Sequence, residues 1–372
     1  MGSMNQSRIT TASGETDEPS DWMMMMMTAN GSNIEHTTAY GEADEHATAY
    51  GEANEHATAY GEADDHNRPM TTPGRDEDTL RLISTKTVLN IGTLNTQTLA
   101  KPGKMDLLLR ELNRYKWDLV GLSEIHLPRT GEETISGTSL LLSGRTDGTH
   151  RQGVGFILSP TTKKALIFFT PVSERIATIR LKGSVSNLTI IQVYAPDSAR
   201  SDEECEQFYF QLQSVTDQTP KKDMLIVMGN FNAITGNDQI DRRDVMGPHG
   251  HGRLNGRGER LISFCRENDL YITNTAFKHR HRRKVTWRSP DGVTENMIDY
   301  VLISKRWKSS IMDTVSLPGA DFDSDHSLLM SKLKLRLNPK TTRIPRFRTE
   351  LLRDPIKKAP IPPAYRQNSE LF

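Results

Sequence analysis

The sequence predicts one α/β domain, of two-layer or sandwich type, placed between two tails. Three observations predict it: helical and strand-like apolar patterns both recur between Val88 and Leu337, most of the strand-like runs are short, and polar loops follow the strand ends. A chain of 372 residues has room for one large domain with tails or for two modest domains. We place the domain at residues 86–338.

The elements of this domain can be placed from their patterns. Short apolar or alternating runs between polar segments predict strands. These runs are residues 88–94, 118–123, 153–158, 175–181, 188–194, 223–228, 270–273, 297–303 and 327–337. Apolar residues at helical spacing predict helices over residues 103–116 and 257–268, and a third helix that begins at Ser201. Ser201 followed by Glu204 is a capping-box pattern, typical of a helix N-terminus.

Both tails lack the apolar residues of a core. Residues 1–80 are acidic and contain three copies of a ten-residue repeat over residues 35–64, each with one tyrosine and no Val, Ile or Leu. Such a segment cannot offset its ordering entropy, so we expect it to be disordered. The repeat histidines could bind a metal weakly, but tandem duplication explains them as well. Residues 339–372 form a proline-rich, basic tail of linker type, also expected to be disordered.

The charge is divided between the tail and the domain. Residues 1–80 hold 3 basic and 16 acidic residues, and the remainder holds 44 basic and 31 acidic residues. A basic domain suits an anionic, phosphate-bearing partner, although a solvated surface is the plainer explanation. The two cysteines are expected to be reduced. Without a long apolar run or a signal-peptide pattern, we expect no membrane association and a nuclear or cytoplasmic, not secreted, protein.

Polar residues of the types that phosphodiester cleavage requires stand at or near the predicted strand ends. They are Asn95, Glu124, Tyr194, Asn230, Asn232, Asp299, Asp325 and His326. Cleavage with a magnesium-like ion needs a carboxylate for the cation, a base for the attacking water and donors for the charge on the phosphoryl oxygens. Taken singly, each residue is better explained by a cap or turn role. Their recurrence at strand ends is unusual for pure scaffolding.

The order of the motifs carries a family resemblance. The motifs are Ile91-Gly-Thr-Leu-Asn95, Leu122-Ser-Glu124, Val193-Tyr-Ala-Pro196, Gly229-Asn-Phe-Asn-Ala233, Asn255-Gly-Arg-Gly-Glu259, Thr286-Trp-Arg-Ser-Pro-Asp291, Ile298-Asp-Tyr300 and Ser324-Asp-His326. The sequence resembles the endonuclease/exonuclease/phosphatase family, and more narrowly the AP-endonuclease-like domain of non-LTR retrotransposons and related host genes. The resemblance implies a four-layer, DNase I-like α/β sandwich, two packed β-sheets flanked by helices, that hydrolyses DNA phosphodiester bonds with Mg²⁺ or Mn²⁺.

For the metal, the resemblance implies three positions. Glu124 corresponds to the principal ligand, with Asn95 beside it, and Asp325 completes the carboxylate cluster near the cation. Carboxylate and amide oxygens are suitable ligands for such a hard cation.

For the phosphate, the resemblance implies four positions. Tyr194 and Asn232 correspond to residues that orient the scissile phosphate by hydrogen bonds. His326 corresponds to the residue that contacts the phosphate and stabilises the developing charge, held in its tautomer by Asp299.

Asn230 departs from the family pattern, which has Asp in the Gly-Asp-Phe-Asn motif to activate or orient the attacking water. An amide has the same shape, but it cannot accept a proton at neutral pH and carries no charge. Loss of a positioned general base costs roughly a hundred- to ten-thousand-fold in rate. The sequence therefore allows an impaired nuclease, a nuclease whose base comes from Asp238, Asp241 or Asp244, or a catalytically silent nucleic-acid-binding or interaction protein.

A basic run precedes the tryptophan of the sixth motif and predicts contacts to DNA. The residues are Arg280, Arg282, Arg283, Lys284 and Trp287. The cations can pair with backbone phosphates and the ring can wedge against bases, with little preference for sequence. A solvated charged loop is an equally good interpretation. Phosphomonoesters or lipid head groups are a further substrate class that the fold allows, and we expect the protein to be a monomer.

Overall fold

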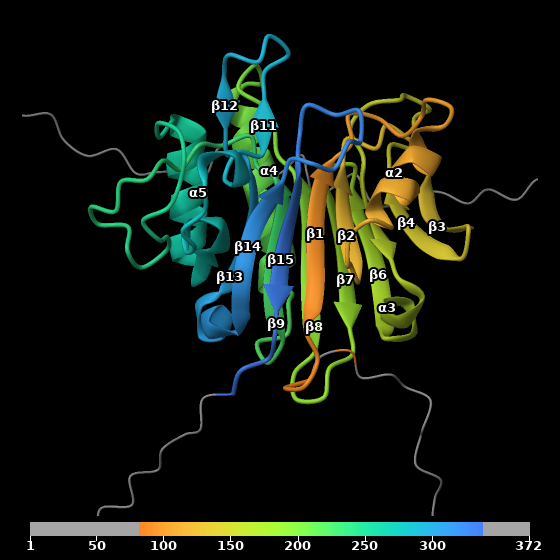
Figure 1. Ribbon diagram of the computed structural model, residues 1–372, viewed down its shortest axis with the longest axis horizontal. Helices are drawn as coiled ribbons and strands as arrows, with labels where there is room; N and C mark the ends of the chain where they lie inside the picture. Colours follow the sequence, from red (N-terminus) through yellow and green to blue (C-terminus); the bar gives the residue numbers. More distant parts are fainter. Residues whose placement is uncertain (1–81, 83, 338–372) are drawn as a thin grey trace, which may run out of the picture. The chain divides into compact units, whose positions relative to one another are not determined.

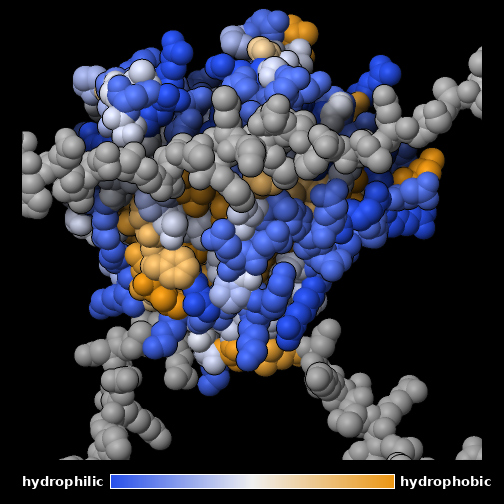
Figure 2. Space-filling view, turned by 180° about the vertical axis from the view of Figure 1, so that it is seen from behind, coloured by the Kyte–Doolittle hydropathy of each residue, from blue (hydrophilic) through white to orange (hydrophobic). Residues whose placement is uncertain are grey.

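The computed structural model describes residue 82 and residues 84–337. The two tails predicted to be disordered lie outside the described residues, which are the parts coloured by position in Figure 1 and by hydropathy in Figure 2. The described chain contains two large mixed sheets, one of seven strands in the order β14-β15-β1-β2-β5-β4-β3 and one of six in the order β10-β13-β9-β8-β7-β6. A small hairpin, β11-β12, stands apart from both. Figure 1 shows the two sheets face to face, with the hairpin projecting beyond one end.

Most strands lie where the apolar runs predict them. The first sheet contains β1 (Leu89–Asn95), β2 (Leu119–Ser123), β3 (Thr130–Ile135), β4 (Thr138–Ser143), β5 (Val154–Leu158), β14 (Ile311–Leu317) and β15 (Leu328–Leu333). The second sheet contains β6 (Leu166–Ser173), β7 (Ile176–Leu181), β8 (Leu188–Tyr194), β9 (Met224–Asn230), β10 (Leu270–Ile272) and β13 (Asp299–Ser304). The hairpin contains β11 (Trp287–Arg288) and β12 (Glu295–Asn296).

Helices cover the outer faces of both sheets. On the first sheet, α2 (Lys104–Leu112) packs through Leu108 and Leu112. On the second sheet, α4 (Asp202–Asp217) and α5 (Gly256–Glu267) pack in a separate apolar cluster. A third cluster fills the space between the sheets. The remaining elements are α3 (Pro160–Lys164), η1 (Thr273–Thr275), η2 (His281–Arg283) and η3 (Lys305–Ser310). The predicted four-layer sandwich is therefore confirmed.

The helix starts follow from side-chain caps. Ser201 Oγ accepts from the backbone N–H of Glu204 at 3.2 Å, so the predicted cap of α4 is present. Asn255 Oδ1 accepts from Gly258 N at 2.8 Å and caps α5. The helix predicted over 103–116 ends earlier, at Leu112, because the chain then passes into tighter turns. Tyr115 lies beyond α2 but still packs against the same apolar cluster. This contact explains why the apolar spacing predicted a longer helix.

The sequence patterns missed four strands of the two large sheets, each for a physical reason, and also both strands of the β11-β12 hairpin. The edge strand β3 has no fully buried residue, and the edge strand β6 contains Pro171, which an edge position tolerates. In β14 a register shift between Ile311 and Asp313 interrupts the alternation. In β4 the three leucines are buried together, so no period of two appears. Within the described part of the chain, no helix has the length and apolar character needed to span a membrane.

Candidate active site

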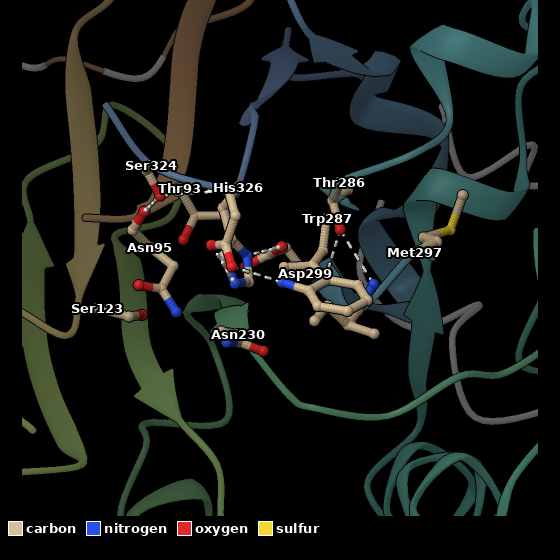
Figure 3. Close-up of polar contacts among 12 residues, drawn as sticks. Thr93, Asn95, Ser123, Asn230, Thr286, Trp287, Met297, Asp299, Ser324 and His326 are labelled. Atoms are coloured by element: carbon tan, nitrogen blue, oxygen red, sulfur yellow. Dashed lines mark hydrogen bonds and ion pairs between the residues drawn. The ribbon is translucent and has the colours of Figure 1, made fainter. Parts of the chain in front are cut away.

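The predicted site residues meet at one end of the sandwich. Parallel pairing of β1 with β2, and of β8 with β9, brings the carboxyl ends of all four strands to this end. The antiparallel strand β13 begins there, so Asp299 lies opposite Asn230, which in turn pairs with Tyr194. The segment before β15 delivers His326 to the same end, beside Asn95. Figure 3 shows this convergence of segments far apart in the sequence.

Glu124 is held by an amide and lies beside a phenol. Asn95 Nδ2 donates to Glu124 Oε1 at 2.7 Å, and the amide is oriented because Gln97 N donates to Asn95 Oδ1 at 3.0 Å. Tyr194, from the other sheet, lies beside the Glu124 carboxylate. Burial, with the nearby Glu124 charge, raises the pKa of Tyr194 well above its ordinary value of 10. Burial and the adjacent carboxylate therefore favour the protonated phenol, which has an O–H to donate.

Asp299 and His326 form a buried dyad. Their Oδ2 and Nδ1 atoms are 2.8 Å apart, and Asp299 is only 1% exposed. Thr286 fixes the strand start, because its Oγ1 accepts from the N–H groups of Ile298 and Asp299, both at 3.0 Å. Burial lowers the pKa of His326. The net shift is nevertheless upward, because Asp299 raises the pKa through its charge and its hydrogen bond, and the charges of Asp325 and Glu124 add to this. The dyad thus favours an imidazolium whose Nε2 is not bound by Asp299.

Asp325 is tied to a tryptophan. Trp287 Nε1 donates to Asp325 Oδ2 at 2.9 Å, and the backbone N–H of Arg288 donates to the Asp325 carbonyl at 3.0 Å. The other carboxylate oxygen, Oδ1, lies 3.7 Å from His326 Nε2 and is buried without a hydrogen-bond partner. Ser324 connects this segment to β1, because its hydroxyl donates to the Asn95 carbonyl at 2.8 Å and accepts from His326 N at 3.1 Å.

The orientation of Asn230 bears on its chemistry. Its Oδ1 accepts from the backbone N–H of Asn232 at 2.8 Å, so the remaining polar atom of the side chain is an NH₂ donor. An aspartate in the same pose would leave a free oxygen there. Asn232 itself has a left-handed backbone, with φ of 49°, and its Nδ2 donates to the carbonyl of Ala195 at 2.8 Å. That turn carries Asn232 beside the end of β8.

The donor set fits a hard divalent cation with few protein ligands. The candidate ligands Glu124, Asn95 and Asp325 offer oxygen, and Asp299 Oδ1 and Asp325 Oδ1 are buried acceptors without partners. Magnesium typically retains several waters and takes only one or two carboxylates. Across residues 84–337, no group of three or more His, Cys, Asp and Glu side chains could enclose a metal. The oxygen donors named above suit a divalent cation that keeps several of its waters.

The predicted DNA-binding residues lie just before β11, except Trp287, which is the first residue of that strand. Arg280, Arg282 and Arg283 are exposed, and in the described chain none of the three has an acidic partner. Lys284 and Trp287 are partly buried. The indole N–H of Trp287 is committed to Asp325, so this residue supports the site as well as facing the predicted DNA surface.

The structure does not bring the proposed replacement carboxylates to Asn230. Asp244 pairs with Arg266 at the end of α5 and with Lys305, directly after the end of β13. The site lies at the opposite end of β13, where Asp299 begins the strand. Asp238 pairs with Arg242, and its neighbour Asp241 belongs to the same loop. The hypothesis that one of these loop residues replaces the family's Asp is therefore not supported by their positions.

The comparisons with known proteins bear on this geometry. The model of a family described as endonuclease-reverse transcriptase matches residues 188–330, from β8 to β15. Craniofacial development protein 2 of Bos taurus is 39% identical over 255 residues, which are 68% of this chain and 42% of that protein. Its counterpart in Tragulus javanicus is 37% identical over 278 residues, 74% of this chain and 47% of that protein.

The chain belongs to the endonuclease/exonuclease/phosphatase family. It spans less than half the length of the curated relatives it matches. Among solved structures, the catalytic domain of Xenopus laevis APE2 superposes with a TM-score of 0.52 at 17% identity, covering 66% of this chain and 92% of that one. At that identity the likeness shows the shared fold of the endonuclease/exonuclease/phosphatase family and nothing finer.

Some supporting residues were not singled out from the sequence. Thr286 and Ser324 lie within the recognised motifs, so their position was a usable signal. Gln97 carried no such signal, because it lies in a loop and its contacts reach Asn95 and residue 325. The role of Trp287 as a donor to Asp325 was also missed, because the two residues are 38 positions apart.

Proposed function

We propose that this domain is a divalent-metal-dependent endonuclease, retroelement-derived, that hydrolyses DNA phosphodiester bonds slowly because Asn230 replaces the usual catalytic Asp. The observation that carries the proposal is the convergence of both halves of a phosphodiesterase site. One sheet contributes Asn95 and Glu124, which share a hydrogen bond, and the other contributes Tyr194, Asn230 and Asp299, of which Asp299 is hydrogen-bonded to His326.

The residues divide the work of the reaction. Tyr194 offers a phenolic O–H, and His326 offers a ring N–H whose raised pKa favours the cation, so both groups are suited to phosphoryl oxygens on which negative charge develops. Asp299 keeps the His326 ring in one orientation, as carboxylates do for catalytic histidines. Glu124, with Asn95 and Asp325, would hold Mg²⁺ or Mn²⁺, which when bound supplies charge neutralisation and a more acidic water.

Asn230 is the weak point of this site. Its free polar atom is a donor, so it can hold the oxygen of a water but cannot take the proton. This deficit supports a second candidate function, a catalytically silent nucleic-acid-binding or interaction protein. The exposed Arg280, Arg282 and Arg283 would serve either function, because backbone phosphates are their natural partners and impose little sequence preference.

A plasmid-nicking time course with Mg²⁺ tests the proposal. The full chain is compared with Glu124→Ala, which removes the principal metal ligand, and with Glu206→Ala as matched control. Glu206 is an exposed glutamate on α4 that pairs only with Arg260 among the described residues. We expect slow nicking by the native chain, its loss in Glu124→Ala, and unchanged nicking in Glu206→Ala.

Three results would decide against the proposal or refine it. Nicking that survives Glu124→Ala would indicate a contaminating nuclease. A native chain that leaves the plasmid intact but binds duplex DNA without metal supports the silent binding protein. Faster hydrolysis of a soluble phosphomonoester than of DNA would indicate that phosphomonoesters, and not DNA, are the substrate class.

We also propose a monomer acting in the nucleus or cytoplasm. Size-exclusion chromatography can check the oligomeric state, and imaging of the tagged chain can check the location.

A further inference from the structure

One buried amide joins the two sheets directly beneath the site. Gln192 lies on β8, two residues before Tyr194, and is 0% exposed. Because side chains alternate along a strand, it points into the core between the sheets together with Ile190, whereas Ile191 and Val193 face the helices. A polar side chain in this otherwise apolar layer requires partners, since an unpaired buried amide is costly.

The partners belong to the opposite sheet. Gln192 Nε2 donates to Ser123 Oγ at 3.0 Å and to Thr93 Oγ1 at 3.1 Å. Ser123 Oγ donates in turn to the carbonyl of Val193 at 3.0 Å, which returns the chain of hydrogen bonds to β8. Figure 3 shows Thr93 and Ser123 next to Asn95.

These partners are the immediate neighbours of the metal-site residues. Ser123 directly precedes Glu124, and Thr93 lies two residues before Asn95 on the same strand. The amide therefore connects the strand that carries Tyr194 to both strands that carry the metal-binding half of the site.

A glycine accommodates the amide. A Cβ placed on Gly121 would lie 1.9 Å from Gln192 Oε1 and 2.8 Å from the terminal methyl of Met228. Contacts this short do not occur, so any side chain at Gly121 would displace the amide. The first sheet thus has a gap in its side-chain layer where Gln192 crosses it.

We propose that Gln192 is a positioning residue that fixes the separation and register of the two sheets at the site, and so the placement of Tyr194 against Glu124. An apolar side chain of similar volume could fill the same space, and such replacements in cores are often neutral for stability. A fully paired polar group instead selects one arrangement of its neighbours. The inference rests on the proposed function, because it assigns the amide to the alignment of that site.

The test compares Gln192→Met with Thr189→Val in the full-length chain. Methionine keeps the length of the side chain and removes its hydrogen bonds. Thr189 lies on the same strand, is equally buried, and donates to Asp223 at 2.8 Å at the far end of β8, so its loss controls for a broken buried hydrogen bond. Melting temperature, Mn²⁺ affinity by calorimetry and ¹⁹F spectra of fluorotyrosine-labelled protein are measured, with Tyr194→Phe assigning the Tyr194 resonance among the nine tyrosines.

We expect both variants to melt at similar temperatures. In Gln192→Met alone, Mn²⁺ affinity should fall on the order of 10- to 100-fold, as for other residues that orient metal ligands, and the Tyr194 resonance should shift. Gly121→Ala should move the same two readouts in the same direction. Equal Mn²⁺ affinity and an equal Tyr194 resonance in Gln192→Met and Thr189→Val would overturn the inference. If the native chain neither binds Mn²⁺ nor nicks DNA, the proposed function fails, and the Tyr194 resonance alone decides the role of Gln192.

Discussion

Asp299 and Asn230 face each other as paired residues on the antiparallel strands β13 and β9. Paired residues on adjacent strands bring their Cβ atoms within about 5 Å, close enough for charges to interact. Asp299 already accepts from His326, and its second oxygen is buried without a hydrogen-bond partner. A neutral side chain at position 230 therefore spares the buried carboxylate a like charge, but it provides no base for the proposed hydrolysis.

Restoring the aspartate should trade stability for activity. We expect Asn230→Asp to raise Mg²⁺-dependent nicking by about a hundred- to ten-thousand-fold, the usual worth of a positioned base. The added charge beside Asp299 should lower the free energy of unfolding by about 1–3 kcal/mol without metal, and Mg²⁺ should recover part of it. Nicking rates and thermal melts with and without Mg²⁺ measure both effects. Unchanged nicking in a folded, Mg²⁺-binding variant would show that position 230 does not limit the rate.

Trp287→Phe distinguishes support of the site from insertion into DNA. Phenylalanine keeps a ring but loses the N–H that binds Asp325. We expect Mn²⁺ affinity to fall about 10-fold, with almost unchanged affinity for a fluorescent duplex in anisotropy titrations. The reverse pattern, weaker DNA binding with normal Mn²⁺ affinity, would indicate that the ring itself wedges against bases.

The three unpaired arginines should dominate the salt dependence of DNA binding. Replacing Arg280, Arg282 and Arg283 together by Ala should reduce the slope of log K against log salt by about 0.9 for each phosphate that the protein no longer neutralises. Arg336→Ala is the matched control, because this exposed arginine lies beyond β15, at the end of the sandwich away from the site. Equal slopes for the triple variant and the native chain would show that these arginines face solvent and do not contact DNA phosphates.

His251 should make the domain less stable in mild acid. Burial lowers its pKa below the ordinary 6.5, with His281 and Lys284 acting in the same direction and Glu295, through its carbonyl and its charge, against them. The unfolded chain then binds the proton more tightly, so the stability that the neutral ring contributes is complete above pH 6.5 and is lost as the pH falls below it. We expect His251→Gln, which keeps a donor for the Glu295 carbonyl, to weaken this pH dependence in melts from pH 7.5 to 5.5. A steeper loss of stability with falling pH in the variant would contradict the lowered pKa of His251.

The strand ends were predictable because they depend on local pattern. Glu124 directly follows a buried strand, and Tyr194 is the last residue of another buried strand, so both could be located without knowledge of the sheets. The pairing of Asp299 with His326 came from the resemblance, and the structure shows it at 2.8 Å. That these residues meet at one end of the sandwich could be predicted only from the sheet topology. The order of the motifs gave that topology by indicating the family.

Contacts across the sandwich could not be predicted in this way. Gln192 lies in an apolar strand, and its partners are 69 and 99 residues distant, so nothing local indicates that Ser123 and Thr93 receive its amide. Edge strands were missed for a related reason, because β3 buries no residue fully and β6 contains a proline. Such elements are defined by their neighbour in the sheet and carry little pattern of their own.

The first and last strands of the domain are direct neighbours, with Leu89 of β1 opposite Leu333 of β15. Both strands have their outward ends away from the site, at the bottom of Figure 1. Because both ends lie there, other sequences could be joined at either end of the domain without a connection crossing the face that carries the candidate site. It also cannot lose its last strand cheaply, because β15 lies inside the seven-stranded sheet, between β14 and β1. A transcript truncated before Leu328 would therefore lack an interior strand and the support of β1, whereas added sequence at either end would leave the domain intact.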